Sequence, residues 1–212
     1  MIAIVDYGMG NLRSVANAFE GLGANAVLTR DKDAIERADA IVLPGVGAFG
    51  KCIENLRKLD LFDLIKDLLN RDKLYLGICL GMQILFDSSE EAPGVAGMGF
   101  IGGRVPRFAG GVKIPHMGWN TVDIVKPHPI FEGVENGSYF YFVHSFYCEP
   151  EEDGVTATRT TYGTEFASSV QKGNVFACQF HPEKSQKIGL KLLSNFIRLS
   201  TRASDSKNEP TA

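Results

Sequence analysis

The stretch LYLGICLGMQILF, residues 74–86, decides the fold, because it combines a buried strand, a sharp turn and a helix around one cysteine. Cys79 lies between Gly77 and Gly81, each two residues away. This spacing matches the G-x-S-x-G elbow, in which a nucleophile sits on a tight strand-to-helix turn that crowds the residues two before and two after it. The two glycines therefore predict a turn that presents the Cys79 sulfur beyond the end of a parallel strand.

Strand and helix patterns alternate on the N-terminal side of this stretch. Continuous apolar runs at 2–5 and 38–44 are typical of buried strands, and apolar residues recur at helical spacing in 11–23 and 48–72. Apolar strands separated by helices predict an α/β fold, a doubly wound and mostly parallel sheet with helices on both faces.

The second half of the chain has shorter candidate strands and more glycine and proline, which predicts an antiparallel β extension of the same sheet. An amphipathic helix is expected at 185–200. We expect one domain over 1–200 and a disordered polar tail over 201–212. The candidate strands of this half are 100–108, 121–126, 138–146, 155–170 and 174–180.

Composition limits the kinds of function. A chain of 212 residues with 44% hydrophobic content can bury a full core, and its net charge of −3 without a basic block argues against nucleic acid or membrane partners. No apolar run approaches the roughly 20 residues of a membrane span, and the first residues lack the cationic lead of a signal peptide. The four cysteines show no C-x-x-C spacing, so we expect a cytoplasmic protein with no metal and no cofactor.

The HPE sequence at 181–183 indicates a base for the thiol. In an extended segment His181 and Glu183 project to the same side, so the carboxylate can orient the imidazole while the other ring nitrogen takes the thiol proton. With Cys79 they predict a Cys-His-Glu triad. The structural alternatives are a buried apolar cysteine, a turn histidine and a solvated glutamate.

Three further histidines allow other interpretations. His128, flanked by prolines, fits a surface loop, whereas His116 and His144 fit either the core or the lining of a site.

The glycine-rich segment GVGAFG at 45–50 has two interpretations. It matches the dinucleotide fingerprint G-x-G-x-x-G, but it follows the third predicted strand, and the sequence about 20 residues later is helical instead of ending a strand at an acidic residue. The favoured interpretation is a loop that turns backbone N–H groups toward an oxyanion, joined by the N–H of Leu80 after the nucleophile. Gly45 and Gly47 permit the peptide rotation that this loop requires.

Six ordered blocks resemble the class I, or triad, glutamine amidotransferases, with GICLG for the nucleophile and HPE for its partners. Relatives that serve anthranilate or guanine synthesis usually carry GICLGHQ, so Met82 favours the subfamily of glutaminase subunits that pair with the cyclase subunit of imidazole glycerol phosphate synthase. The blocks are DYGMGNLRSV, LPGVGAFG, LGICLGMQILF, PHMGWN, YFVHSFY and QFHPEKS.

The resemblance implies a glutamine amidotransferase domain over 1–200 that hydrolyses glutamine to glutamate and ammonia. In that subfamily the ammonia passes to a separate (β/α)₈-barrel cyclase subunit in a heterodimer. The products are imidazole glycerol phosphate for histidine synthesis and an aminoimidazole carboxamide ribonucleotide for purines.

The resemblance also implies roles for individual residues. The catalytic triad would be Cys79, His181 and Glu183. The oxyanion would be held by backbone N–H groups near Val46 and Gly47 and at Leu80. Residues that bind glutamine would be Gly47, Gln83, Glu91, His144, Ser145 and Phe146. Residues that face the cyclase would be Asn11, Trp119 and Lys184.

Two positions leave questions open. Phe146 stands where many relatives have tyrosine, which removes a hydroxyl but leaves main-chain recognition. Trp119, the only tryptophan, lies in the polar, glycine-rich context MGWNT, where it is either an interface anchor or a cover for the edge of its own sheet.

Two functions remain as alternatives to the amidotransferase. One is a non-catalytic scaffold or binding module in which the elbow is a relic. The other is a free-standing cysteine hydrolase of glutamyl substrates, which has the same elbow but does not need the partner-facing blocks.

Overall fold

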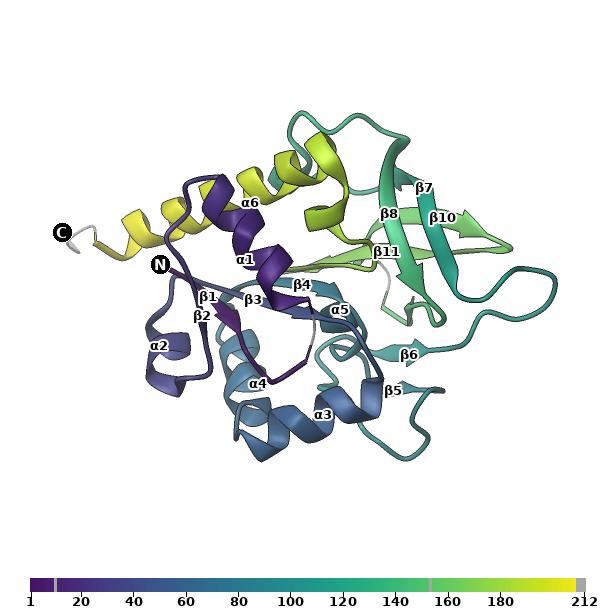
Figure 1. Ribbon diagram of the computed structural model, residues 1–212, viewed down its shortest axis with the longest axis horizontal. Helices are drawn as coiled ribbons and strands as arrows, with labels where there is room; N and C mark the ends of the chain where they lie inside the picture. The colour runs from purple at the N-terminus through teal and green to yellow at the C-terminus, as the bar shows by residue number, and fades with distance from the viewer. Residues whose placement is uncertain (10, 153, 209–212) are drawn as a thin grey trace.

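A large sheet organises the computed structural model, which describes residues 1–9, 11–152 and 154–208 (Figure 1). Its nine strands within those residues are, in spatial order, β2 (Ala26–Thr29), β1 (Ile2–Val5), β3 (Ala40–Gly45), β4 (Leu74–Cys79), β12 (Val175–Cys178), β11 (Thr164–Lys172), β10 (Thr156–Tyr162), β7 (His116–Ile124) and β8 (Ser138–His144). The pairings from β2 to β12 are parallel, and those from β12 to β8 are antiparallel. The predicted parallel sheet with an antiparallel extension is confirmed.

A smaller sheet and several helices complete the described fold. The small sheet contains β5 (Ser88–Ser89), β6 (Gly103–Val105) and β9 (Glu149–Pro150). The helices are α1 (Leu12–Gly21), α2 (Lys32–Arg37), α3 (Phe49–Lys58), α4 (Phe62–Asn70), α5 (Leu80–Gln83), α6 (Gln186–Asn208) and the 3₁₀ helices η1 (Pro129–Phe131) and η2 (Pro182–Lys184). None of the helices in the described part of the chain combines the length and apolar character that crossing a membrane requires.

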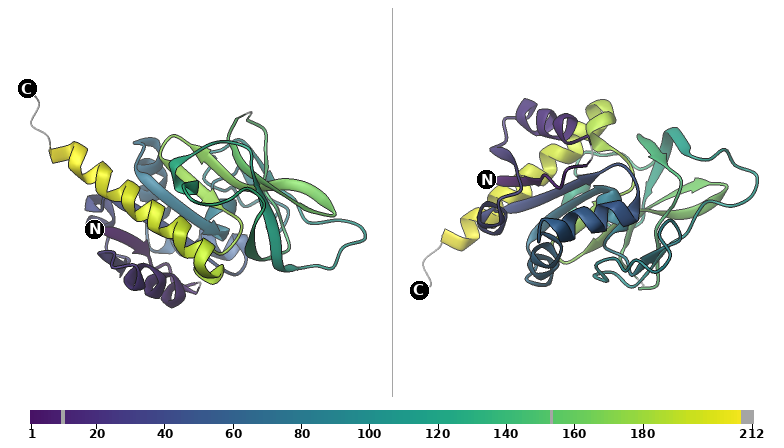
Figure 2. Two further views of the ribbon diagram at one scale, coloured as in Figure 1. Left: turned by 90° about the horizontal axis from the view of Figure 1, so that it is seen from above. Right: turned by 60° about the horizontal axis from the view of Figure 1, so that its bottom comes forward.

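Helices cover both faces of the parallel part of the sheet, as Figures 1 and 2 show. Ile2 and Ile4 of β1 belong to the core shared with α1 and α6, whereas Ala3 and Val5 belong to the core shared with α2, α3 and α4. Because both faces of β1 and β3 are buried, alternation disappears and these strands are apolar throughout. This arrangement accounts for the continuous apolar runs in the sequence.

Strand β7 begins earlier than the sequence predicted. It starts at His116 instead of residue 121, and it pairs with β8 from His116 opposite His144 to Val122 opposite Ser138. Trp119 therefore lies within a strand, opposite Tyr141. Gly118 and the polar residues around it have low strand propensity, and the ladder to β8 overrides that preference.

Helix α6 also differs from its prediction. It continues to Asn208 instead of ending at residue 200, and 209–212, the end of the predicted tail, lie outside the described residues. The stretch 201–208 contains neither glycine nor proline, and extending an existing helix adds one hydrogen bond for each residue fixed. The polar composition of 201–208 is thus compatible with the end of a helix.

Gly77 and Gly81 let the chain turn tightly at Cys79. A Cβ atom at Gly81 would lie 1.9 Å from the carbonyl oxygen of Leu43, and one at Gly77 would lie 2.5 Å from the carbonyl oxygen of Gly81. No side chain fits at either position unless the backbone moves, so the predicted crowding around the cysteine is confirmed. The backbones of β3, β4 and the turn touch without intervening side chains.

Gly81→Ala should lower the free energy of unfolding by at least about 3 kcal/mol. Overpacking usually destabilises a core by about 1–3 kcal/mol, and the backbone carbonyl of Leu43 has little freedom to move away. Gly21→Ala is the matched control. No atom lies within 4 Å of its added Cβ, so it should raise the same free energy by about 0.5–1 kcal/mol. Urea unfolding followed by circular dichroism measures both, and equal effects of the two changes would contradict the crowding at the turn.

Candidate active site

Cys79 lies where the carboxyl ends of β3, β4 and β12 meet. In the sheet register Gly45 is opposite Cys79, and Cys178 is opposite Ile78. Cys79 has φ 54° and ψ −103°, a backbone conformation that a residue with a side chain adopts only under strain. A strained residue at a strand-to-helix turn has the geometry of a nucleophile elbow, which holds the sulfur beyond the sheet.

The helix that follows the elbow is shorter than predicted. The stretch 74–86 predicts a helix after the turn, and the N-terminus of a helix can stabilise a thiolate, but α5 is a single turn of four residues. The carbonyls of Ile84 and Leu85 accept hydrogen bonds from Met98 and Phe100 instead of continuing the helix. Because the helix dipole grows from aligned peptides, one turn contributes little, and other groups must stabilise charge on the sulfur.

His181 and Glu183 form a buried pair. The Nδ1–H of His181 donates to the carboxylate Oε1 of Glu183 across 2.8 Å, and the side chains are 2% and 1% exposed. The sequence predicted an extended segment here, but Pro182 begins the 3₁₀ helix η2. Proline favours the first position of a helix, and one 3₁₀ turn still brings the carboxylate to the imidazole.

The second nitrogen of His181 is available for the thiol. Nε2 of His181 and Oε2 of Glu183 are buried without a hydrogen-bond partner among the described residues. Burial by itself lowers the pKa of His181, but the neighbouring Cys79 and Glu183 outweigh it and raise the pKa to about 10. The site therefore favours the imidazolium form of His181, a cation that can stabilise a cysteine nucleophile.

A cavity of about 470 Å³ opens at the sulfur and collects the residues predicted to bind glutamine and its oxyanion. His181 and Glu183 are absent from its lining. The cavity is lined by Val46, Gly47, Cys79, Leu80, Gln83, Glu91, Pro115, Val143, His144, Ser145, Phe146 and Lys184. Their individual roles remain predictions. The fold brings them together from distant parts of the sequence, between Val46 and Lys184.

The loop after β3 is held at both of its ends. Gly45 lies beside Cys79 in the sheet, and the carboxylate Oε2 of Glu91 accepts a hydrogen bond of 2.7 Å from the backbone N–H of Phe49, the first residue of α3. Between them Gly47 has φ +118°, which a side chain would strain, and a Cβ there would meet Met9 at 2.5 Å. The glycine is thus required by the loop beside the nucleophile, consistent with the oxyanion interpretation of GVGAFG.

His116 and His144 form a directed chain of hydrogen bonds next to the cavity. The carbonyl of Phe146 can only accept, so Nδ1–H of His144 donates to it across 2.7 Å. Burial lowers the pKa of His144 to about 3 and that of His116 to about 4, so both rings are neutral. The Nε2 of His144 then accepts from Nδ1–H of His116 at 2.9 Å, and Asn120 donates to the far nitrogen of His116 at 3.2 Å.

One residue at the sulfur was missed by the sequence prediction. Gln179 is fully buried, and its side-chain nitrogen lies 3.4 Å from the sulfur of Cys79. Its carboxamide oxygen accepts a hydrogen bond of 3.1 Å from Gln83. The available signal was a single amide in the apolar strand NVFACQF, directly before the HPE sequence.

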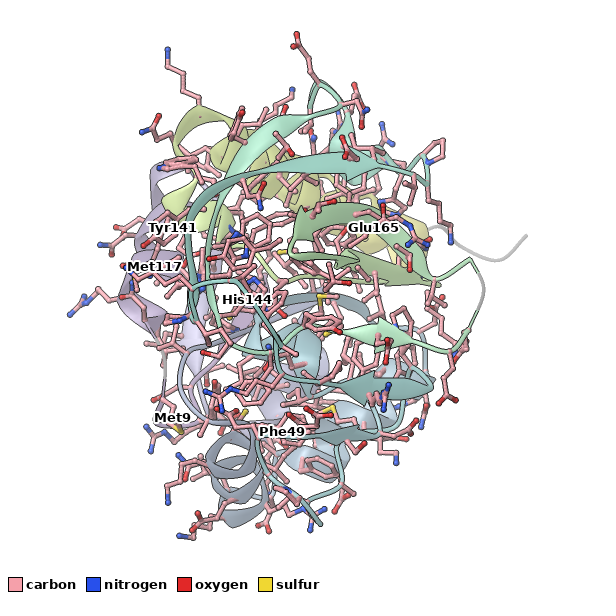
Figure 3. All side chains as sticks on the ribbon, turned by 90° about the vertical axis from the view of Figure 1, so that its right-hand side faces the viewer. Met9, Phe49, Met117, Tyr141, His144 and Glu165 are labelled. Carbon is pink, nitrogen blue, oxygen red and sulfur yellow. The ribbon has the colours of Figure 1, made fainter. Side chains whose placement is uncertain are left out.

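Two of the residues predicted to face a partner lie against the same ring, that of Tyr141. Trp119 is 45% exposed and packs edge-on against Tyr141 at 6.1 Å, and Nζ of Lys184 lies 5.9 Å from the centre of the same ring. Figure 3 shows Tyr141 and Met117 at the edge of the face that carries His144. Asn11 is the residue directly before α1.

The chain matches the family model of Glutamine amidotransferase class-I over residues 3–199, and it therefore belongs to the class-I glutamine amidotransferase family. It is 51% identical to the imidazole glycerol phosphate synthase subunit HisH of Methanocaldococcus jannaschii, over 94% of this chain and 100% of that protein. It is also 51% identical to the subunit of the same name from Methanothermobacter thermautotrophicus, over 94% of this chain and 98% of that protein. The predicted family is confirmed.

Solved structures show the same fold at low sequence identity. A crystal structure of a glutamine amidotransferase has a TM-score of 0.75 and 22% identity, over 95% of this chain and 100% of that chain. PurLQS from Thermotoga maritima has a TM-score of 0.72 and 23% identity, over 93% of this chain and 97% of that chain. The sheet and its covering helices are thus shared with this structural class.

The buried histidines predict how stability depends on pH. The pKa of His144 is about 3 when folded and about 6.5 when unfolded, so its contribution is complete above pH 6.5 and is lost as pH falls toward 3. His144→Gln should flatten this loss by up to about 1.4 kcal/mol per pH unit, since one proton fewer is taken up on unfolding. Urea unfolding at a series of pH values measures it, and parallel curves for both proteins would show that His144 is not the group responsible.

Proposed function

We propose that the chain is the glutaminase subunit of an imidazole glycerol phosphate synthase. It hydrolyses glutamine to glutamate and ammonia and passes the ammonia to a cyclase subunit, which forms imidazole glycerol phosphate and an aminoimidazole carboxamide ribonucleotide in histidine biosynthesis. The observation that carries the proposal is the strained Cys79 beside the buried pair of His181 and Glu183, at the mouth of a cavity. Identity of 51% to the HisH subunits supports it.

The reaction follows from the roles of the triad. The sulfur of Cys79 attacks the side-chain carbonyl carbon of glutamine, and Nε2 of His181 holds the thiol proton while Glu183 fixes the opposite nitrogen. The oxyanion is stabilised by backbone N–H groups of the loop at Val46 and Gly47 and by that of Leu80. Collapse breaks the carbon–nitrogen bond, and His181 returns the proton to the departing ammonia. Water then attacks the thioester, which gives glutamate and frees the thiol.

The polar groups of the cavity suit a ligand that brings hydrogen-bond donors. The side-chain nitrogen of Gln83 donates to both Gln179 and the carbonyl of Phe146, so the oxygen of Gln83 is left to accept from glutamine. Glu91 uses one carboxylate oxygen on Phe49, and its other oxygen can receive an ammonium group. Because the carbonyl of Phe146 is occupied, main-chain recognition at that residue uses its N–H, and no tyrosine hydroxyl is needed.

The partner contact is proposed on one face of β7 and β8. Strand alternation gives Met117, Trp119, Tyr139 and Tyr141 the same side of this pair, and the first three are 62%, 45% and 59% exposed. Large apolar and aromatic side chains that are exposed together on one face are typical of a protein interface. Lys184, which lines the cavity and lies over Tyr141, connects this surface to the active site. The role of Asn11 rests on the family resemblance alone.

The reduced state of the thiols supports a location in the cytoplasm. All four cysteines are free and buried, as expected for a protein in a reducing compartment.

Cys79→Ala should lower glutamine-dependent synthesis by the complex about a thousandfold or more, because it removes the nucleophile, whereas synthesis from added ammonia should be unchanged. The assay follows formation of imidazole glycerol phosphate with either nitrogen source. Cys52→Ala, a change of another buried cysteine in α3, is the control and should keep both activities. Equal loss of both activities, or of neither, in Cys79→Ala would refute the assignment.

Trp119→Ala should weaken binding of the cyclase at least about tenfold, because a central aromatic anchor contributes more than its neighbours. Val27→Ala changes a residue of similar exposure, 42%, on the opposite edge strand β2, and it should leave binding unchanged. Isothermal titration calorimetry of each variant with the cyclase measures both. If Trp119→Ala bound as tightly as the unaltered chain, the surface of β7 and β8 would not be the interface.

A further inference from the structure

The sulfur of Cys79 has a second neighbour besides His181, the carboxamide of Gln179. Nε2 of Gln179 lies 3.4 Å from the sulfur, within hydrogen-bond distance for a sulfur acceptor. Gln179 follows β12 directly, and β12 is the strand beside β4 in the sheet. Its side chain is fully buried at 0% exposure, so its polar atoms require partners inside the protein.

The direction of each hydrogen bond in this network follows from its fixed end. The carbonyl of Phe146 can only accept, so Gln83 must turn its NH₂ group toward it, at 3.2 Å. The same NH₂ group also lies 3.1 Å from Gln179, which must therefore present its oxygen to Gln83. With its oxygen directed at Gln83, Gln179 has only its NH₂ group to direct at the sulfur. The two amides are thus oriented by one backbone carbonyl.

We propose that Gln179 is a further catalytic residue, which donates an N–H to the sulfur of Cys79 and stabilises the thiolate before attack and when it leaves the thioester. This inference rests on the proposed glutaminase function. Hydrogen bonds to a charged acceptor are stronger than those to a neutral one, so the donor favours the thiolate over the thiol. The one-turn helix α5 gives the sulfur little dipole support, and Gln179 supplies a donor in its place.

A purely structural role for Gln179 explains the network less well. The residues before it in β12 are Val175, Phe176, Ala177 and Cys178, all buried in the two cores, and an apolar side chain would continue that pattern. Burying an amide is unfavourable unless its donors are satisfied. Among the described residues the donor of Gln179 has the sulfur as its side-chain partner, which ties the amide to the nucleophile.

The test is the pH dependence of alkylation of Cys79 by iodoacetamide in the full chain, followed by mass spectrometry of the Cys79 peptide. Gln179→Leu should slow alkylation at neutral pH about tenfold and move the midpoint of the rate upward by about one pH unit, since the donor to the thiolate is lost. Gln179→Glu keeps the acceptor for Gln83 but replaces the donor by a carboxylate, so its midpoint should move further. Profiles that superpose on that of the unaltered chain would overturn the proposal.

Asn195→Leu is the matched control, because it removes another buried amide far from the sulfur. Asn195 donates to the carbonyls of Ile130 and Glu132 from α6. It should lower the melting temperature without moving the alkylation midpoint. In the complex, Gln179→Leu should lower kcat for glutamine more than it raises KM. If the unaltered complex does not turn over glutamine, the proposed function is contradicted. The alkylation profiles then still decide whether Gln179 donates to the sulfur.

A measurement on the unaltered side chain covers the case in which the Gln179 variants do not fold. The ¹⁵N resonance of the Gln179 carboxamide should titrate with the same midpoint as alkylation of Cys79. In Cys79→Ala this titration should disappear, whereas the carboxamide of Asn195 should titrate in neither protein. If the ¹⁵N chemical shift of the Gln179 carboxamide did not change as Cys79 ionises, the proposal would be overturned without any substitution at Gln179.

Discussion

The close approach of backbone to backbone at the turn after β4 is the constraint on which the rest of the structure depends. Gly81 lies so near the carbonyl of Leu43 that only hydrogen fits between them, and the hydroxyl of Tyr75 holds the carbonyl of Gly81 at 2.8 Å. This packing keeps Cys79 in its left-handed conformation, which is otherwise unfavourable by about 1–3 kcal/mol. The packing of the sheet thus offsets the strain that holds the sulfur in position.

Around this turn the protein combines two kinds of sheet for two purposes. The parallel half brings the ends of β3, β4 and β12 to one edge, where the loop after β3, Cys79 and His181 meet. The antiparallel half extends from that edge and contributes the segment at His144 and the exposed aromatic side of β7 and β8. The proposed sites of catalysis and of partner contact therefore occupy adjoining parts of one sheet. The hydrogen bonds from Asn120 to Phe146 run between them.

The sequence was sufficient for the features that depend on local spacing. The glycines around Cys79, the apolar strands and the pairing of His181 with Glu183 follow from neighbours within a few residues. Gln179 next to the sulfur and the bond between His116 and His144 could not be predicted, because each joins residues on different strands whose register only the folded sheet defines. The start of β7 at His116 could not be predicted for the same reason, because the hydrogen bonds that define this strand are made with β8.

The pairing of β12 with β4 also has a consequence for the order of events during synthesis. Val175 to Cys178 lie beside Tyr75 to Ile78, so the strands that hold the nucleophile and its base are separated by about 100 residues of chain. During synthesis the growing polypeptide contains Cys79 long before His181 and Glu183 have been added. Once they have been added, β12 must still insert between β4 and β11. Cys79, His181 and Glu183 are therefore brought together by one of the last non-local contacts of the fold.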